Sequence, residues 1–378
     1  MDSGLDQARF ALQRWCLDAR SDDAFAIIEL ERLFIEHCQC FLDSRMENGF
    51  SLSTYAPKHA PAISIVDNSN FGAKAYIDGD RDTIEINEGT LSFIIGMSLK
   101  CVSNPLFSII GQSDGQTISR RRFTALNSAS LIGSYDIPLD PMRRAIAIEL
   151  GFFAFLIVLF HEVGHLAQNH CRLIRGSACH DFGDDEKAKK SELSQNQIQS
   201  LEFMADLFSV RELMIYIQSV RDEWFPEGKV TRELSIQEMA LYFCVGDQTS
   251  SQSSIFTALG IIFYLTSSSS RRHPDRSLRL LSTLLACKRL IPQGLGQEVK
   301  SADLLAGSDA IQLVSYTVAA SIPIGEDFEH IANVLESPNG FQLAQNGIDT
   351  LRRDFLELRP HLQAFAAAEK AFIKFDDE

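Results

Sequence analysis

The stretch that decides the fold reads Phe160-His161-Glu162-Val163-Gly164-His165 and directly follows the apolar run from Leu150 to Leu159. Such a run predicts a buried helix that carries the H-E-x-x-H motif into the interior. On a helix the two histidines, four residues apart, lie on one face about one turn apart, so both imidazoles can bind one metal ion. Glu162 lies roughly 100° round the helix from His161. It could therefore hold a water molecule rather than the metal.

H-E-x-x-H also occurs by chance, so a metal site needs a third ligand. The segment Ser200 to Phe208 is again helical in pattern, and Glu202 and Asp206 share one face of it. Acids in so apolar a segment need partners, because unpaired buried charge is costly. Glu202 would complete a His2Glu zinc set with an open fourth position, and Asp206 would orient a ligand histidine. The alternative is a buried helix with two satisfied histidines and no metal.

H-E-x-x-H followed by E-x-x-A-D from Glu202 resembles the gluzincin metallopeptidases, specifically the branch of the HtpX and CAAX-prenyl proteases. His170 stands nine residues after His161, as is frequent in that branch. A third segment resembles its H-P-x-x-x-x-R-[IL] box and reads His273-Pro274-Asp275-Arg276-Ser277-Leu278-Arg279-Leu280. The three boxes in this order also resemble the phage-exclusion peptidase Lit and its relatives.

This resemblance implies a zinc-dependent endopeptidase of an intracellular protein substrate, acting in phage defence or in regulated proteolysis. Glu162 would be the general base. A further donor must stabilise the oxyanion, and the family box offers His273 or Arg279. The alternatives are a helix-start residue for His273 and, for Arg279, a salt bridge to a core acid such as Asp206.

A function of a different class is a non-enzymatic regulatory or interaction domain that zinc stabilises on the same scaffold. A structural zinc site has no use for a general base, so the intact Glu162 argues against it. The purely structural alternative without any metal also stays open.

Composition limits the partners and the compartment. The chain has 378 residues, enough for one large domain or two. Its net charge of −15 argues against general nucleic-acid or anionic-membrane binding. The eight cysteines are scattered without a C-x-x-C pair, and the acidic N-terminus resembles no signal peptide. Together these features predict reduced thiols and a cytoplasmic protein.

No membrane span is expected. The longest apolar run, Ala145 to Phe160, contains Glu149 and ends at the metal motif. It is short of the ~20 residues that a spanning helix needs. It therefore predicts a core helix.

The predicted fold class is α+β and mostly α-helical, with a zincin-like core. Three strands are expected at Ile63–Val66, Ala73–Ile77 and Thr83–Asn87, because the hydrophobic period there approaches two. We expect them to form a small antiparallel sheet beside the H-E-x-x-H helix. An edge strand of this sheet could hold a peptide by strand addition, or the sheet could be purely structural.

The chain divides into a helical segment at 1–50, a zincin-like domain at 51–290 and a helical accessory layer at 291–378. Two helices are expected between residues 6 and 43, broken near Ser21. Residues 103–140 are expected to be an irregular insertion. Asp140 and Pro141 are an N-cap and first helical residue, and their helix is expected to run to about Arg172. The second ligand helix is expected from about Leu193 to Val220.

Overall fold

The computed structural model describes residues 3–18, 24–52, 59–79, 81–103, 117–122, 134–173, 193–226, 230, 233–265, 279 and 338–363. The strands are β1 (Ala62–Val66), β2 (Ala73–Asp78), β3 (Arg81–Asn87), β4 (Thr117–Arg122) and β5 (Ser134–Pro138). The helices before the H-E-x-x-H motif are α1 (Ser3–Asp18), α2 (Ala24–Glu47) and α3 (Glu88–Val102). Those that carry or follow it are α4 (Pro141–Ala167), α5 (His170–Leu173), α7 (Gln195–Trp224), α8 (Ile236–Val245), α9 (Gln248–Leu265) and α13 (Pro338–Gln363).

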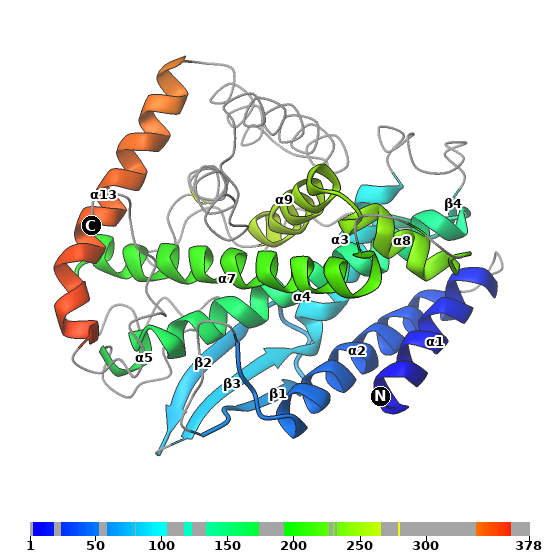
Figure 1. Cartoon of the computed structure of the whole chain (residues 1–378), viewed down its shortest axis with the longest axis horizontal. Coiled ribbons are helices and arrows are strands. Elements are labelled where there is room, and N and C mark those ends of the chain that lie inside the picture. The colour runs from blue at the N-terminus through cyan, green and yellow to red at the C-terminus, as the bar shows by residue number, and fades with distance from the viewer. Residues whose placement is uncertain are drawn as a thin grey trace.

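Helix α4 is the centre of the molecule (Figure 1). It begins as the sequence predicts: the side chain of Asp140 accepts hydrogen bonds from the backbone N–H groups of Met142 and Arg143, and Pro141 occupies the first turn. Helices α3, α7, α8 and α9 and the sheet all contact it. The apolar residues of α4 therefore form the middle of one large hydrophobic core.

The three expected strands are confirmed, but they do not form an antiparallel sheet. Their order is β1-β3-β2, in which β2 pairs antiparallel and β1 pairs parallel with the central β3. A short turn with Gly79 at φ +60° connects β2 to β3, whereas β1 joins the other side of β3 in the same direction. The sheet is therefore mixed. Its buried residues Ala73, Ala75, Ile84 and Ile86 belong to the main core.

The insertion at 103–140 is not irregular throughout. Strands β4 and β5 form a separate two-stranded antiparallel sheet, with a register shift between Thr117 and Arg120. The prediction was therefore wrong for these two segments. Residues 104–116 and 123–133 lie outside the described part of the chain.

The two N-terminal helices are confirmed, and they share the core of α4. Leu12 and Trp15 of α1 and Phe34 of α2 belong to the same cluster of buried residues as α4. The Arg144 guanidinium donates to the carbonyl oxygen of Cys16 at 2.6 and 3.0 Å, which ties the end of α1 to the start of α4. Helices α1 and α2 thus pack as part of the central body.

The described C-terminal helix covers the N-terminal half of α7 (Figure 1). Four buried residues of α13 pack against α7 in a second, smaller cluster: Leu351, Phe355, Leu358 and Leu362. Their partners on α7 are Leu201, Phe203, Met204 and Leu207. This C-terminal helix therefore supports the turn of α7 that contains Glu202 and Asp206.

Among the helices that the structure describes, only α4 is long and apolar enough to cross a membrane, and its apolar window is wholly buried. The apolar run from Ala145 to Phe160 is shorter than α4, the helix that contains it. α4 has 27 residues. Core helices of globular proteins meet the same criteria.

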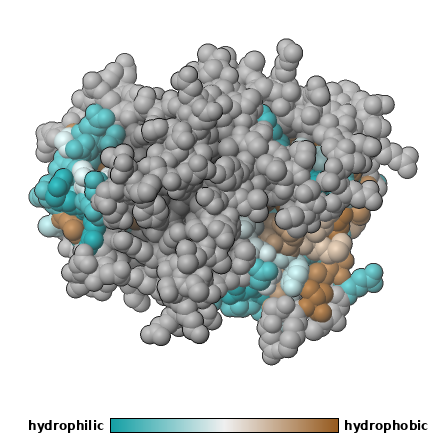
Figure 2. All heavy atoms as spheres, turned by 90° about the horizontal axis from the view of Figure 1, so that it is seen from above, coloured by the Kyte–Doolittle hydropathy of each residue, from teal (hydrophilic) through white to brown (hydrophobic). Residues whose placement is uncertain are grey.

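Helix α8 is amphipathic. Ala240, Leu241 and Cys244 face the core, while Met239 and Phe243 are exposed. Figure 2 shows apolar residues gathered at one end of this face of the molecule. None of the site residues described below comes from α8.

The packing of α13 on α7 can be tested at Phe355, which is fully buried. We expect Phe355→Ala to lower the free energy of unfolding by about 3–5 kcal/mol, because the change leaves a cavity against α7. Urea unfolding measures the effect. The exposed Glu357 on the same helix is the matched control, and Glu357→Ala should stay within about 0.5 kcal/mol. Equal stabilities of the two variants would contradict this packing.

Candidate metal centre

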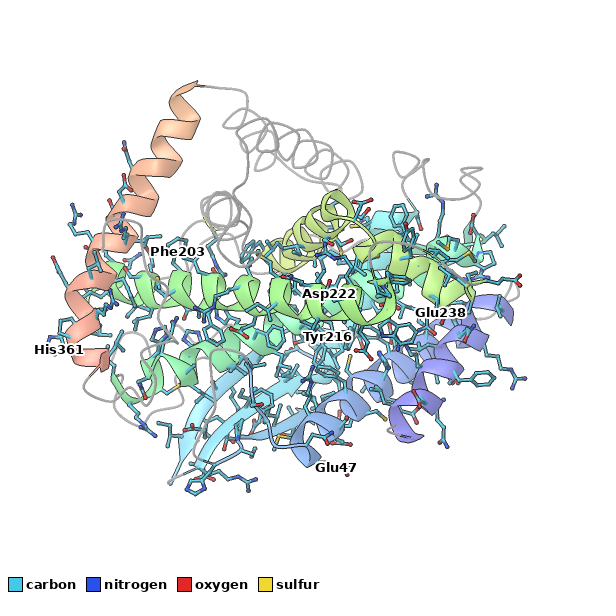
Figure 3. The ribbon with its side chains drawn as sticks, viewed as in Figure 1. Glu47, Phe203, Tyr216, Asp222, Glu238 and His361 are labelled. Carbon is cyan, nitrogen blue, oxygen red and sulfur yellow. The ribbon has the colours of Figure 1, made fainter. Side chains whose placement is uncertain are left out.

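The site forms where α4 and α7 pack closely against each other. Gly164 of α4 faces Ala205 and Phe208 of α7, and a Cβ atom at Gly164 would lie 3.3 Å from the Ala205 Cα atom. At the other end of the pair, the rings of Phe152 and Tyr216 lie 6.4 Å apart. The two helices are therefore antiparallel. In Figure 3, Phe203 lies on the part of α7 near α13, and Tyr216 lies further along α7 near the middle of the molecule.

The close approach brings His161, His165 and Glu202 together, as the sequence predicts. The Nε2 atoms of the histidines are 3.0 Å apart. Glu202 Oε2 lies 3.3 Å from the Nε2 atom of His161 and 3.7 Å from that of His165. All three side chains are buried. This His-His-Glu group could bind a metal ion.

The spacing of these donor atoms suits a four-coordinate metal. Bonds of ~2.0–2.1 Å at tetrahedral angles place neighbouring ligand atoms ~3.3–3.4 Å apart. The three separations in the structure, from 3.0 to 3.7 Å, bracket that value. The triangle of donors therefore fits a metal ion without a change of backbone.

Asp206 contacts both a ligand histidine and Arg279. Its Oδ1 atom lies 2.9 Å from His161 Nδ1. The Arg279 side chain donates from Nε and Nη2 to the two Asp206 oxygens, at 2.8 and 2.7 Å. The same guanidinium lies over the ring of Phe263, 4.7 Å from its centroid. Both partners proposed for Asp206 from the sequence are thus present, and Arg279 lies in the position of the salt-bridge alternative.

The charges around His161 favour a cation at this place. Burial alone would lower the pKa of His161, but the hydrogen bonds and charges of Asp206 and Glu202 outweigh it and raise the pKa to about 10. Burial would raise the pKa of Asp206, but the charge of Arg279 and the hydrogen bond to His161 hold it below its usual value. A proton on His161 thus occupies the place where a metal ion would sit.

Glu162 is the second residue of the motif and lies in the interior. Its side chain is 0% exposed, on α4 next to a metal-ligand candidate. The role of Glu162 as a general base stays a prediction. His273 lies outside the described residues.

The helix of the motif ends earlier than expected. α4 stops at Ala167, and Asn169 adopts a left-handed conformation with φ 59° before the short helix α5 begins at His170. The prediction that one helix runs to about Arg172 is therefore wrong. The break brings His170 back towards the site, with its Nδ1 atom 2.9 Å from the Nδ1 atom of His165. The sequence signal that marks this residue is its position nine residues after His161, but spacing alone does not indicate the contact.

Comparison of the chain with protein-family models, with curated proteins and with solved protein structures found no match. The resemblance to gluzincins therefore rests on the three sequence boxes.

The double role of Asp206 can be tested with Asp206→Asn, which keeps the shape and removes the charge. We expect zinc affinity to fall by roughly 10–100-fold, because His161 loses its charged acceptor. We also expect a stability loss of about 3–5 kcal/mol, because the buried Arg279 loses its counter-charge. Chelator competition and thermal unfolding measure the two effects.

Arg279→Met separates the two effects of Asp206, because it leaves the bond from Asp206 to His161 in place. Arg279→Met should destabilise the fold, but its loss of zinc affinity should be smaller than that of Asp206→Asn. If Asp206→Asn kept full zinc affinity and only lowered the melting temperature, Asp206 would contribute to stability but not to zinc binding.

The raised pKa of His161 predicts that metal binding depends on pH. A metal must displace the proton that His161 holds below about pH 10, so apparent affinity should rise by up to about tenfold per pH unit towards that value. In the metal-free protein the same shift stabilises the fold fully below pH 6.5, and this is lost as pH rises through about 10. Titration calorimetry in buffers of different ionisation enthalpy counts the protons released. No proton release, with equal affinity in neutral and alkaline buffer, would contradict the assignment.

Proposed function

We propose that this protein is a zinc-dependent endopeptidase in which His161, His165 and Glu202 hold the metal. The single observation that carries the proposal is the buried triangle of Nε2, Nε2 and Oε2 atoms, with edges of 3.0 to 3.7 Å. Two imidazoles and one carboxylate with room for a fourth ligand are typical of catalytic zinc, whereas structural sites are usually closed by four protein ligands.

The donor types also favour zinc over harder metals. Magnesium and calcium prefer sets of oxygen ligands, while imidazole suits zinc and other transition metals. A bound zinc ion would supply Lewis-acid polarisation of a carbonyl group and would lower the pKa of water to about 7.

Within this proposal Glu162 moves the proton. Its carboxylate accepts a proton from the attacking water and returns it to the nitrogen of the leaving amine. Glu162 belongs to the same helix as His161 and His165, in its buried part. The proposed base and two of the proposed ligands therefore share one element.

Asp206 and Arg279 support the site through the Nδ1 side of His161. Asp206 accepts a hydrogen bond from His161 Nδ1, which leaves Nε2 to face the metal. Arg279 fixes the carboxylate of Asp206 with two hydrogen bonds. An oxyanion donor therefore has to come from another group or from the remaining N–H groups of Arg279. His273 keeps that role only as a proposal from the resemblance.

The substrate is proposed from the resemblance and from one feature of the sheet. β2 is an outer strand of the β1-β3-β2 sheet, and it packs beside α4 and α5. A peptide could add to an outer strand in this position. An intracellular protein substrate, a cytoplasmic location and a role in phage defence or regulated proteolysis follow from the sequence boxes and composition.

A metal site that only stabilises the fold is the competing function. The complete burial of the three ligands would suit it. In such a site the carboxylate of Glu162 would have no catalytic task, and replacing it by an amide would remove no peptide hydrolysis.

Glu162→Gln separates the two functions. We expect the variant to keep its fold and one zinc per chain but to lose peptide hydrolysis by at least ~10²-fold, because an amide cannot accept the water's proton. Elemental analysis and cleavage of a substrate identified by comparing protein N-termini in cells provide the measurements.

Glu202→Ala is the contrasting variant, since it should lose zinc as well as activity. Wild-type activity in Glu162→Gln would rule out the mechanism. Full zinc retention in Glu202→Ala would remove Glu202 from the ligand set.

A further inference from the structure

His170 contacts the ring of His165 on the side away from the triangle of donor atoms formed by His161, His165 and Glu202. The Nε2 atom of His165 faces His161 and Glu202, at 3.0 and 3.7 Å. The Nδ1 atom of the same ring lies 2.9 Å from His170 Nδ1. Both rings are fully buried. The contact is therefore a direct bond between two imidazoles without exposure to solvent.

The tautomers of this pair follow from the direction of each ring. If His165 Nε2 carries the lone pair that binds a metal, the proton of the neutral ring lies on Nδ1. This N–H then donates to His170 Nδ1. His170 must accept there, so its own proton lies on Nε2. Only one arrangement of protons in the pair is compatible with a metal ligand at His165.

The helix break at Asn169 makes this contact possible. In an uninterrupted helix, a residue five positions after His165 would lie about 140° round the axis and about 7.5 Å along it. The left-handed Asn169 turns the chain back instead. Asparagine tolerates this conformation far better than a β-branched residue does.

The short helix α5 is held in place from two sides. The carbonyl oxygen of Asn169 accepts hydrogen bonds from the backbone N–H groups of Arg172 and Leu173, at 3.2 and 3.1 Å. Cys171 Sγ lies 3.7 Å from the carbonyl oxygen of Ala75 in β2. His170 is thus fixed between the end of α4 and the sheet, and its ring has a defined position.

We propose that His170 is the positioning residue of His165: by accepting a hydrogen bond from His165 Nδ1, it holds the Nε2 atom of His165 towards the metal. The inference rests on the zinc site proposed above and extends it. His161 and His165 are then oriented by different chemistry, an anionic carboxylate at Asp206 and a neutral imidazole at His170. Loss of either partner should weaken metal binding.

The test compares His170→Leu with His170→Asn in the full-length protein. Leucine removes the acceptor, whereas the Asn side-chain oxygen can occupy nearly the position of the histidine Nδ1 atom. With Zn²⁺ as the probe in chelator competition, we expect His170→Leu to bind zinc roughly 10–100-fold more weakly and His170→Asn to recover most of the affinity.

His37→Leu is the matched control for loss of a buried histidine. His37 is 8% exposed and packs on Phe152 with ring centroids 5.0 Å apart. This contact lies nine residues before His161 on α4, so the variant should leave zinc affinity unchanged. A loss of affinity in His37→Leu as large as that in His170→Leu would show a general effect of stability and overturn the inference.

A second pair of variants leaves the ring untouched. Asn169→Gly can adopt the left-handed conformation and should keep zinc affinity, whereas Asn169→Val cannot do so without strain and should lose it. In the zinc-loaded wild type, ¹⁵N spectra of the histidine rings should show His165 protonated at Nδ1 and His170 protonated at Nε2.

Three further results would overturn the inference: wild-type zinc affinity in His170→Leu, no rescue by His170→Asn, or a proton on His170 Nδ1 in the zinc-loaded protein. The outcome is distinguishable from a failure of the proposed function. If the wild type binds zinc and His170→Leu does not, but neither cleaves any peptide, the positioning role holds while the peptidase proposal fails.

Discussion

The contact between α4 and α7 at Gly164 is the constraint on which the site depends. Without a side chain at Gly164, the backbone of α7 comes within van der Waals distance of α4. His161 and Glu202, 41 positions apart in the sequence, then meet at 3.3 Å. A larger residue here would have to separate the helices by a few tenths of an ångström. The ligand triangle would widen by a similar amount.

The surrounding fold keeps this contact rigid. Asp140 caps the first turn of α4. The apolar residues of α4 are covered by α3, α8, α9 and the sheet. The other ligand helix begins with a capping box formed by Ser194 and Gln197. α13 packs on its outer side. Buried polar groups are costly in such a core. Glu202 and Asp206 accordingly each lie beside an imidazole, and Asp206 also pairs with Arg279.

The two ligand histidines sit in unlike electrostatic surroundings. His161 lies between two carboxylates, and one of them is held by the Arg279 guanidinium. His165 contacts a second imidazole instead. Glu202 and Asp206 contact His161 directly, and Glu162 is its neighbour on α4. Three acids against one guanidinium favour binding of a cation.

Much of this site could be predicted from sequence because its elements are helices with clear periodicity. The i, i+4 spacing of His161 and His165 and of Glu202 and Asp206 depends only on helical geometry. The strands were predictable from their alternation, but the parallel pairing of β1 with β3 was not, because alternation gives no strand direction. The contact of His170 was also hidden, since it depends on one left-handed residue at Asn169. The Arg279 contact with Asp206 depends on packing over 73 positions, which spacing cannot specify.

X-ray absorption spectroscopy of the zinc-loaded protein tests the central claim most directly. We expect a first shell of two imidazole nitrogens and oxygen ligands at ~2.0–2.2 Å, with four ligands in total and no sulfur. The oxygens would come from Glu202 and from solvent in the open position. A sulfur neighbour at ~2.3 Å, or no zinc retained by the folded protein, would contradict the account.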